Sequence, residues 1–141
     1  MVTRKTPAQI DHMRSAGRVV AEILEKVQDA ARPGVSTATL DEVAREVLSR
    51  RGARSNFLNY HGFPATICTS PNHVIVHGIP SPEVVLGDGD IVSIDAGAII
   101  EGWHADAAVT FAIGDVDDES VRLMDVTRRS LDEALGQVVE G

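Results

Sequence analysis

The chain has 141 residues, of which 43% are hydrophobic and 24% are charged, and its formal net charge is −8. This length supports one globular domain with a core and leaves little room for a second. No basic run exceeds two residues, as at Arg50-Arg51 and Arg128-Arg129, so the charge pattern argues against nucleic acid as a partner. The single cysteine, Cys68, excludes an internal disulfide and a thiolate zinc cluster. Residues 1–10 lack an apolar signal core and no apolar run reaches membrane-spanning length, so we interpret the protein as cytoplasmic, without membrane contacts.

The first fifty residues predict two amphipathic helices. Thr6-Pro7 is typical of a helix start, and the first helix should end near residues 32–34, which read Arg-Pro-Gly. The second helix should begin at Ser36 or Thr37 and end at Gly52. Apolar residues recur at helical spacing in both: Ile10, Met13, Gly17, Val20, Leu24, Val27 and Ala31 in the first, and Leu40, Val43, Ala44, Val47 and Leu48 in the second.

From Arg54 to Ile113 the period changes to that of strands and turns. The predicted strands are Ser55 to Leu58, Thr66 to Thr69, His73 to Val76, Ile91 to Ala98 and Trp103 to Ile113. A last helix should run from about Asp118 to Val139, with Val121, Met124, Leu131, Leu135 and Val138 facing inward. Two helices, a mostly antiparallel sheet and a further helix predict an α+β layer architecture, with residues 1–141 as a single unit.

Two aspartates stand in the middle of the last two predicted strands. A two-residue turn at Glu101-Gly102 would place Asp95 opposite Ala108 and bring Asp106 onto the same face, diagonally across. A three-residue turn with a bulge at Gly102 would change this register. The sequence therefore predicts converging carboxylates, on the condition that the turn has two residues.

Converging carboxylates on a half-buried sheet face repel each other unless a cation or a shared proton offsets the repulsion. Oxygen ligands alone suit Mg, Mn or Ca, and together with imidazole they also suit Zn, Co or Fe. The alternative is that Asp95 or Asp106 is an ordinary carboxylate in water. Mid-strand positions among Val, Ile, Ala, Thr and Phe make that alternative weaker, because strands disfavour Asp.

Three histidines are further candidates. His77 precedes Gly-Ile-Pro in a loop and could donate a hydrogen bond to a substrate group or a developing oxyanion; the alternative is an ordinary loop histidine. His61 stands in a similar loop, before Gly-Phe-Pro. His104 shares the face of Asp106, where it could be a ligand or a donor that orients a ligand.

Cys68 has no acidic or histidine pattern that makes a convincing nucleophile triad, so we interpret it as a small apolar pocket residue. Together with Phe57, Tyr60 and Phe63 it predicts an apolar pocket beside His77. Membership of an ordinary core is the alternative for all four.

The segments HGFP (residues 61–64), TSPNHVIVHGIP (69–80), GDGDIVSIDAGA (87–98) and GWHADAAVTF (102–111) resemble the N-terminal half of a type I methionine aminopeptidase. The resemblance implies the pita-bread fold, in which two pseudo-symmetric α+β halves enclose two divalent metal ions, with Co, Mn, Fe, Zn or Ni as candidates. It also implies the family's activity, which is removal of the initiator methionine from nascent proteins.

The same resemblance implies roles for individual residues. Asp95 would chelate one metal, Asp106 would bridge both, and His77 would act catalytically by hydrogen bonding to the substrate or its tetrahedral intermediate. The methionine pocket would be lined in part by Phe57, Tyr60, Phe63 and Cys68, and His61 and His104 would support the site from outside. The implied partners are peptides with an N-terminal methionine, nascent chains and the ribosome, and the complete protein is expected to be a monomer.

In the family, a histidine and two glutamates complete the ligand set from the C-terminal half, which would follow Gly141. We therefore expect this chain to be truncated and inactive alone. Two other readings stay open: a non-catalytic peptide-binding module of the same fold, and a relative directed to X-Pro substrates, such as aminopeptidase P or prolidase.

Overall fold

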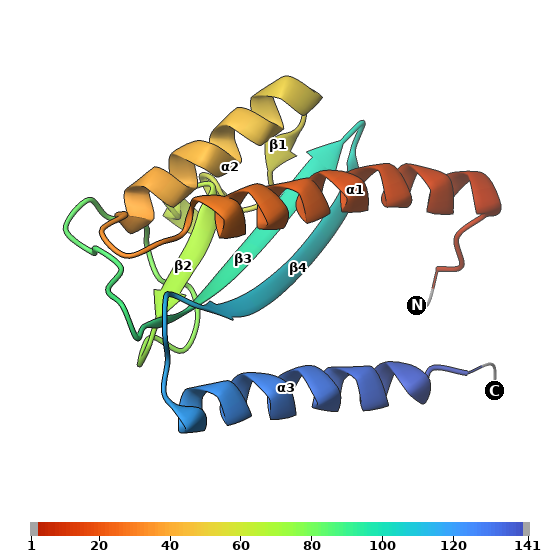
Figure 1. Ribbon diagram of the computed structural model, residues 1–141. Helices are drawn as coiled ribbons and strands as arrows, with labels where there is room; N and C mark the ends of the chain where they lie inside the picture. Colours follow the sequence, from red (N-terminus) through yellow and green to blue (C-terminus); the bar gives the residue numbers. More distant parts are fainter. Residues whose placement is uncertain (1–2, 140–141) are drawn as a thin grey trace.

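The computed structural model describes residues 3–139, which form three α-helices and a four-stranded antiparallel sheet (Figure 1). In chain order the elements are α1 (Pro7–Ala30), α2 (Thr37–Arg51), β1 (Arg54–Ser55), the 3₁₀ helix η1 (Tyr60–Gly62), β2 (Ile67–Pro71), β3 (Ile91–Ile100), β4 (Trp103–Ala112) and α3 (Asp118–Gly136). β4 pairs with the whole length of β3, and β1 and β2 share the other edge of β3. The predicted α+β class is confirmed. None of the helices within residues 3–139 is long and apolar enough to cross a membrane.

The ends of the first two helices lie where the sequence predicted them. The Thr6 side chain accepts a hydrogen bond from the Gln9 backbone, the Gln9 side chain accepts one from the Thr6 backbone, and Pro7 opens the helix. Ser36 caps α2, which ends at Gly52 with a left-handed backbone (φ 62°). These local signals fix where each helix starts and stops.

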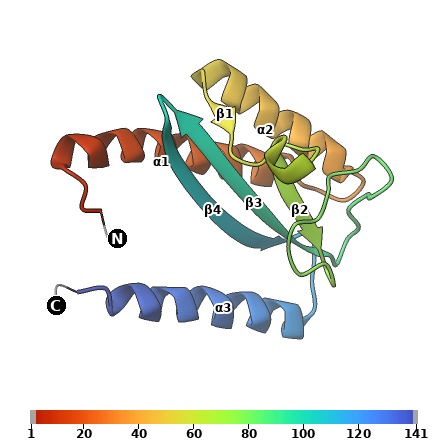
Figure 2. The same ribbon diagram turned by 180° about the vertical axis from the view of Figure 1, so that it is seen from behind.

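α1 and α2 cover one face of the sheet and form the core with it (Figures 1 and 2). The fully buried core residues include Ile23 and Val27 of α1, Leu40 and Ala44 of α2, and Ile94 of β3. The predicted stripes are right over most of their length. The exceptions are Ile10 and Met13, each 39% exposed, because the first turns of α1 extend past the sheet (Figure 1).

A buried carboxylate ties α2 to the sheet. Asp41 Oδ1 accepts hydrogen bonds from the backbone N–H groups of Thr66 (2.6 Å) and Ile67 (3.0 Å), and its Oδ2 accepts one from Arg45 (2.8 Å). Charge-assisted hydrogen bonds to a buried carboxylate are among the stronger polar contacts in a protein. Thr66 and Ile67 stand at the start of β2, so this contact holds the start of that strand in place. It thereby also holds Cys68 of β2 opposite Asp95 of β3.

The β3–β4 hairpin has the register that the two-residue turn predicts. Glu101 (φ 49°) and Gly102 (φ 82°) form the turn, Asp95 lies opposite Ala108, and Asp106 lies opposite Gly97. The intervening residues of β3 face the helices and are buried. Alternation therefore puts residues 95, 97, 104 and 106 together on the face that α1 and α2 do not cover.

Two predicted strands are wrong or too long. The strand predicted from Ser55 to Leu58 is only Arg54–Ser55, and residues 73–76 form no strand. After Pro71 the chain turns back, with Val74 N donating to the carbonyl of Pro71 (3.0 Å). Asn72 takes a left-handed backbone (φ 50°), which interrupts the extended conformation. The alternating pattern there reflects a loop that exposes its apolar side chains.

The inward face predicted for the last helix is wrong as well. In α3, Val121, Leu131 and Leu135 are 51%, 58% and 59% exposed and Met124 is only half-buried; Val138 is 80% exposed and lies beyond the end of the helix at Gly136. The helix itself forms where predicted and is capped by Asp117, but it lies apart from the sheet (Figures 1 and 2). An amphipathic pattern predicts a helix with an apolar stripe. It does not guarantee that the same stretch of chain supplies a surface for that stripe.

Candidate metal-binding site

The two predicted carboxylates lie on the same face of the hairpin, diagonally across from each other. Asp106 is opposite Gly97, and Asp95 is two residues before Gly97 on β3. Asp106 is exposed, whereas Asp95 is half-buried and its Oδ1 atom is buried without a hydrogen-bond partner among residues 3–139. An unpaired buried oxygen of this kind is costly unless a donor or a cation satisfies it.

The charges of Asp106 and His77 both influence the pKa of Asp95. Burial raises the pKa of Asp95 above its ordinary value, the negative charge of Asp106 raises it further, and His77 acts in the opposite direction. Desolvation and a like charge therefore both oppose ionisation of Asp95. A cation on this face would relieve both effects.

Cys68 lies next to Asp95, and its thiol is not activated as a nucleophile. It pairs with Asp95 across the β2–β3 ladder and is 4% exposed. Burial, with added repulsion from Asp95 and Asp106, raises the pKa of the thiol to about 11. The thiol is therefore neutral near pH 7, which agrees with its interpretation as an apolar residue and argues against a nucleophile.

His77 is held beside β2 by the residue that follows it. Gly78 accepts a hydrogen bond from Thr69 N (2.9 Å) and donates one to Ser70 Oγ (3.1 Å). A Cβ atom at Gly78 would lie 2.0 Å from the carbonyl oxygen of Thr69, so only glycine fits there. His77 itself is exposed and takes a left-handed backbone (φ 56°). The side chain therefore projects from a fixed point on an otherwise open loop.

The predicted aromatic pocket residues come together only in part. Phe57 and Phe63 pack edge to face, with ring centroids 6.5 Å apart, and both are half-buried. Tyr60 is 67% exposed and contacts the ring of His61, which is exposed too. His104 is also exposed and lies opposite Ile99, on the face of Asp106. Phe57 and Phe63 therefore contact each other, whereas Tyr60, His61 and His104 are open to solvent.

Two glycines and an asparagine shape this face; the sequence analysis noted Gly78 after His77 but missed Gly97 and Asn56. Gly78 positions His77, and Gly97 accommodates the side chain of Asn56, which lies over it. A glycine in the middle of a strand is a recognised sign of close approach by another group, so Gly97 carried a usable signal. Asn56 carried no such signal in the sequence, because its role depends on a contact with Ala105 across β3.

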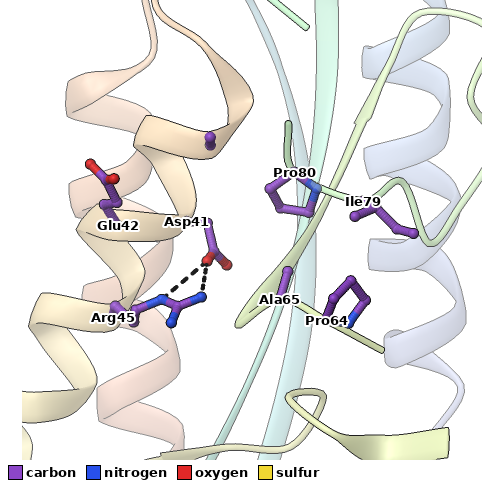
Figure 3. Close-up of a pocket in the computed structure, with 8 residues that line it drawn as sticks. Asp41, Glu42, Arg45, Pro64, Ala65, Ile79 and Pro80 are labelled. Atoms are coloured by element: carbon purple, nitrogen blue, oxygen red, sulfur yellow. Dashed lines mark hydrogen bonds and ion pairs between the residues drawn. The ribbon is translucent and has the colours of Figure 1, made fainter. Parts of the chain in front are cut away.

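A separate hollow of about 400 Å³ lies between α2 and the loops that flank β2 (Figure 3). Its lining includes Asp41, Arg45, Ala65, Ile79 and Pro80. None of the predicted site residues lines it. Figure 3 shows its charged pair, Arg45 and Asp41, in contact with each other, and Asp41 also accepts a hydrogen bond from Thr66 N at the start of β2, so we do not assign the chemistry to this hollow.

Within residues 3–139, no group of three or more His, Cys, Asp or Glu side chains is arranged to hold a metal ion. The described part of the chain therefore brings two carboxylates together without completing a ligand set. Two carboxylates give a divalent ion only part of the coordination shell it prefers.

Comparison with known proteins identifies the family of the chain. Residues 11–141 match the model of metallopeptidase family M24. The chain is 46% identical to methionine aminopeptidase 1 of Mycobacterium tuberculosis over 141 residues, which are 100% of this chain and 53% of that protein. It is 42% identical to methionine aminopeptidase 1 of Bacillus subtilis, of which it covers 56%.

Solved structures agree. A methionine aminopeptidase from Thermotoga maritima superposes with a TM-score of 0.97 at 35% identity, over 100% of this chain and 57% of that one. Aminopeptidase P of Escherichia coli superposes less closely, with a TM-score of 0.81 at 26% identity over 94% of this chain and 29% of that one. The chain spans about half the length of the curated relatives it matches, and its fold is one α+β half of the pita-bread fold. By the length and strength of these matches, the chain belongs to metallopeptidase family M24 and is a homologue of the type I methionine aminopeptidases.

Proposed function

We propose that the protein to which this chain belongs removes the N-terminal methionine from peptides and nascent proteins, and that this chain supplies part of its metal site. The supporting observation is that Asp95 and Asp106 share one open sheet face in a chain 46% identical to a methionine aminopeptidase. The more distant likeness to aminopeptidase P makes an X-Pro activity the weaker candidate.

The residues on this face fit a divalent metal ion. Asp95 and Asp106 provide hard oxygen donors, the buried Oδ1 of Asp95 has no other partner, and the pKa of Asp95 is raised by burial and by Asp106. When bound, a divalent ion lowers the pKa of a coordinated water and polarises a carbonyl group. In this proposal Asp95 and Asp106 hold the metal.

The neighbouring residues would act on the substrate. His77, fixed by the contacts of Gly78, would donate a hydrogen bond to the substrate carbonyl or to the oxyanion that develops from it. Phe57 and Phe63, already in contact, would pack against the methionine side chain, with Tyr60 at the rim and the neutral Cys68 at the base. His61 and His104 would support the site from its edge.

We also propose that residues outside 3–139 must complete the ligand set, since the described chain offers two carboxylates and no third ligand grouped with them. The chain alone should therefore bind a metal weakly and release no methionine. Adding Co²⁺ or Mn²⁺ and a Met-Ala-Ser peptide tests this directly. Robust methionine release by the chain alone would contradict the need for further ligands.

Activity can be tested by fusing the chain to the part of the M. tuberculosis relative that it does not match. The fusion should release methionine from Met-Ala-Ser and leave Ala-Pro-Ser intact; the reverse preference would favour the X-Pro reading. Asp95→Asn and Asp106→Asn should each abolish both Mn²⁺ binding and activity. Asp132→Asn is the matched control, because Asp132 is an exposed helical carboxylate that pairs only with Arg128.

A further inference from the structure

The side chain of Asn56 crosses the sheet on the face that carries the two carboxylates. Asn56 directly follows β1, and its backbone N–H donates to the carbonyl of Gly97 in β3 (3.3 Å). Its side-chain Nδ2 donates to the carbonyl of Ala105 in β4 (3.0 Å). Because β1 and β4 pair with opposite edges of β3, the carboxamide spans the central strand.

Gly97 makes this crossing possible. A Cβ atom at Gly97 would lie 2.5 Å from Asn56 Nδ2 and 2.7 Å from Asn56 Cγ. The Cβ direction at Gly97 is that of Asp95, since alternate residues of a strand face the same side. Gly97 also lies opposite Asp106. The carboxamide therefore occupies the space that a side chain at position 97 would fill, on the carboxylate face and beside both aspartates.

The side chain of Asn56 holds the backbone directly before Asp106. The carbonyl that Asn56 holds belongs to Ala105, so it is part of the peptide group that leads into Asp106. The other end of the carboxamide, Oδ1, is buried and has no hydrogen-bond partner in the part of the chain that the structure describes. A buried unpaired acceptor opposes folding and offsets what the Nδ2 hydrogen bond contributes. Stability alone is therefore a poor account of asparagine at this position.

We propose that Asn56 is a positioning residue for the metal site, an inference that rests on the proposed function of Asp95 and Asp106 as metal ligands. By bridging β1, β3 and β4 over Gly97, it fixes the peptide before Asp106, and so fixes where the Asp106 carboxylate stands relative to Asp95. Metal affinity depends on ligands that are already oriented, and residues that orient them typically contribute about 10–100-fold.

The test is Mn²⁺ binding to the fusion of the chain with the unmatched part of the M. tuberculosis relative, measured from the electron paramagnetic resonance signal of free Mn²⁺ as protein is added. Asn56→Ala should weaken Mn²⁺ binding at least about tenfold, with an unfolding midpoint close to that of the wild type. Gly97→Ala should have a similar effect, because the new Cβ displaces the carboxamide. The double variant should bind no more weakly than either single variant, since both remove the same contact.

Asn72→Gly is the matched control. The Asn72 carboxamide is also tied to β3, accepting from Ile91 N (3.1 Å) and donating to Asp90 (2.8 Å), and its left-handed backbone suits glycine. This variant should bind Mn²⁺ as the wild type does. Unchanged binding in Asn56→Ala and Gly97→Ala, or an equal loss in Asn72→Gly, would overturn the inference. A wild-type fusion that binds no Mn²⁺, or binds it regardless of Asp95→Asn, would instead overturn the proposed function, and the inference with it.

Discussion

The molecule has a packed region and an open region that differ in what their side chains touch. The packed region consists of α1, α2 and the sheet face they cover; the open region consists of the opposite face of the β3–β4 hairpin, the loop of residues 72–80 and α3. Ile23 and Ile94, in the packed region, are fully buried. Ile75 and Leu135, in the open region, are 88% and 59% exposed.

The two strands of the hairpin contribute to both regions, so the contrast cannot come from local backbone structure. It comes from what alternate side chains meet: helices on one side, and on the other glycine, two carboxylates and a buried oxygen without a partner. The packed region accounts for the stability of the fold. The open region carries the groups suited to chemistry, and the experiments below test that division.

The largest effect should come from removing matched side chains of the two amphipathic helices. Ile23→Ala, in α1, should lower the free energy of unfolding by about 2–5 kcal/mol, because it leaves a cavity in the core. Leu131→Ala, in α3, should change it by less than about 0.5 kcal/mol, because that side chain is already in solvent. Urea denaturation of both variants measures the difference. Similar losses would mean that α3 is packed in solution.

The thiol of Cys68 reports on the boundary between the regions. Since its pKa is raised to about 11, the folded chain should react with iodoacetamide at pH 8 roughly 100-fold more slowly than the urea-unfolded chain. A raised thiol pKa favours the folded state below the ordinary thiol pKa of about 8.5, and this contribution is lost as the pH rises towards 11.

Removing the neighbouring charges separates burial from electrostatics. The double variant Asp95→Asn/Asp106→Asn should speed the labelling of Cys68, because both carboxylates help to raise its pKa. Labelling at pH 8 as fast as in urea would contradict the buried, charge-flanked position. Unchanged labelling in the double variant would mean that burial acts alone.

Gly78→Ala tests whether the open loop is held at a fixed point. The new Cβ would lie 2.0 Å from the carbonyl of Thr69, so the loop must move, at a cost of about 1–3 kcal/mol. Gly17→Ala is the control: nothing lies within 4 Å of a Cβ there, and alanine in a helix should stabilise by about 0.5–1 kcal/mol. Urea unfolding gives both free energies, and the NMR shifts of the His77 ring should change only in Gly78→Ala. A Gly78→Ala variant as stable as the wild type would contradict the tight contact.

The sequence predicted the elements whose signals are local. Thr6-Pro7, Ser36 and Gly52 marked helix ends, and the Glu101-Gly102 turn set the register that brings Asp95 and Asp106 together. The strand predicted at residues 73–76 failed because alternating apolar residues do not distinguish a strand from a loop that exposes them. The prediction that α3 has a buried face was wrong because burial requires a partner surface. Hydrophobic periodicity does not show whether such a surface is present.

The residues of the site also divide into those that the sequence could predict and those that it could not. The carboxylates could be predicted because strand alternation converts spacing into a shared face. The contact of Asn56 with Ala105 could not, because it joins residues 49 positions apart across a third strand. Asp41 was missed for a similar reason: its backbone partners lie 25 and 26 residues away.

The smallest expected effect is a gain in stability, when Asp95 is replaced by asparagine. Burial and the charge of Asp106 raise the pKa of Asp95, so ionisation of Asp95 opposes folding near pH 7. Asp95→Asn should therefore stabilise the metal-free chain, by less than about 1 kcal/mol because solvent screens the pair, or at most about 2–4 °C in Tm. The gain should shrink as the pH falls and be largely lost at the ordinary carboxyl pKa of 3.8, because the wild-type side chain is then protonated in the folded state.

Mn²⁺ should then reverse the order of stability, raising the Tm of the wild type and leaving that of Asp95→Asn unchanged, since only a pair of carboxylates binds the ion. Thermal unfolding at pH 7 and at pH 3.8, with and without Mn²⁺, measures all of these changes. A lower Tm for Asp95→Asn without metal at pH 7 would mean that the carboxylate contributes to the fold. Asp95 would then belong with the packed region, and the division between stability and chemistry would not follow the two faces of the sheet.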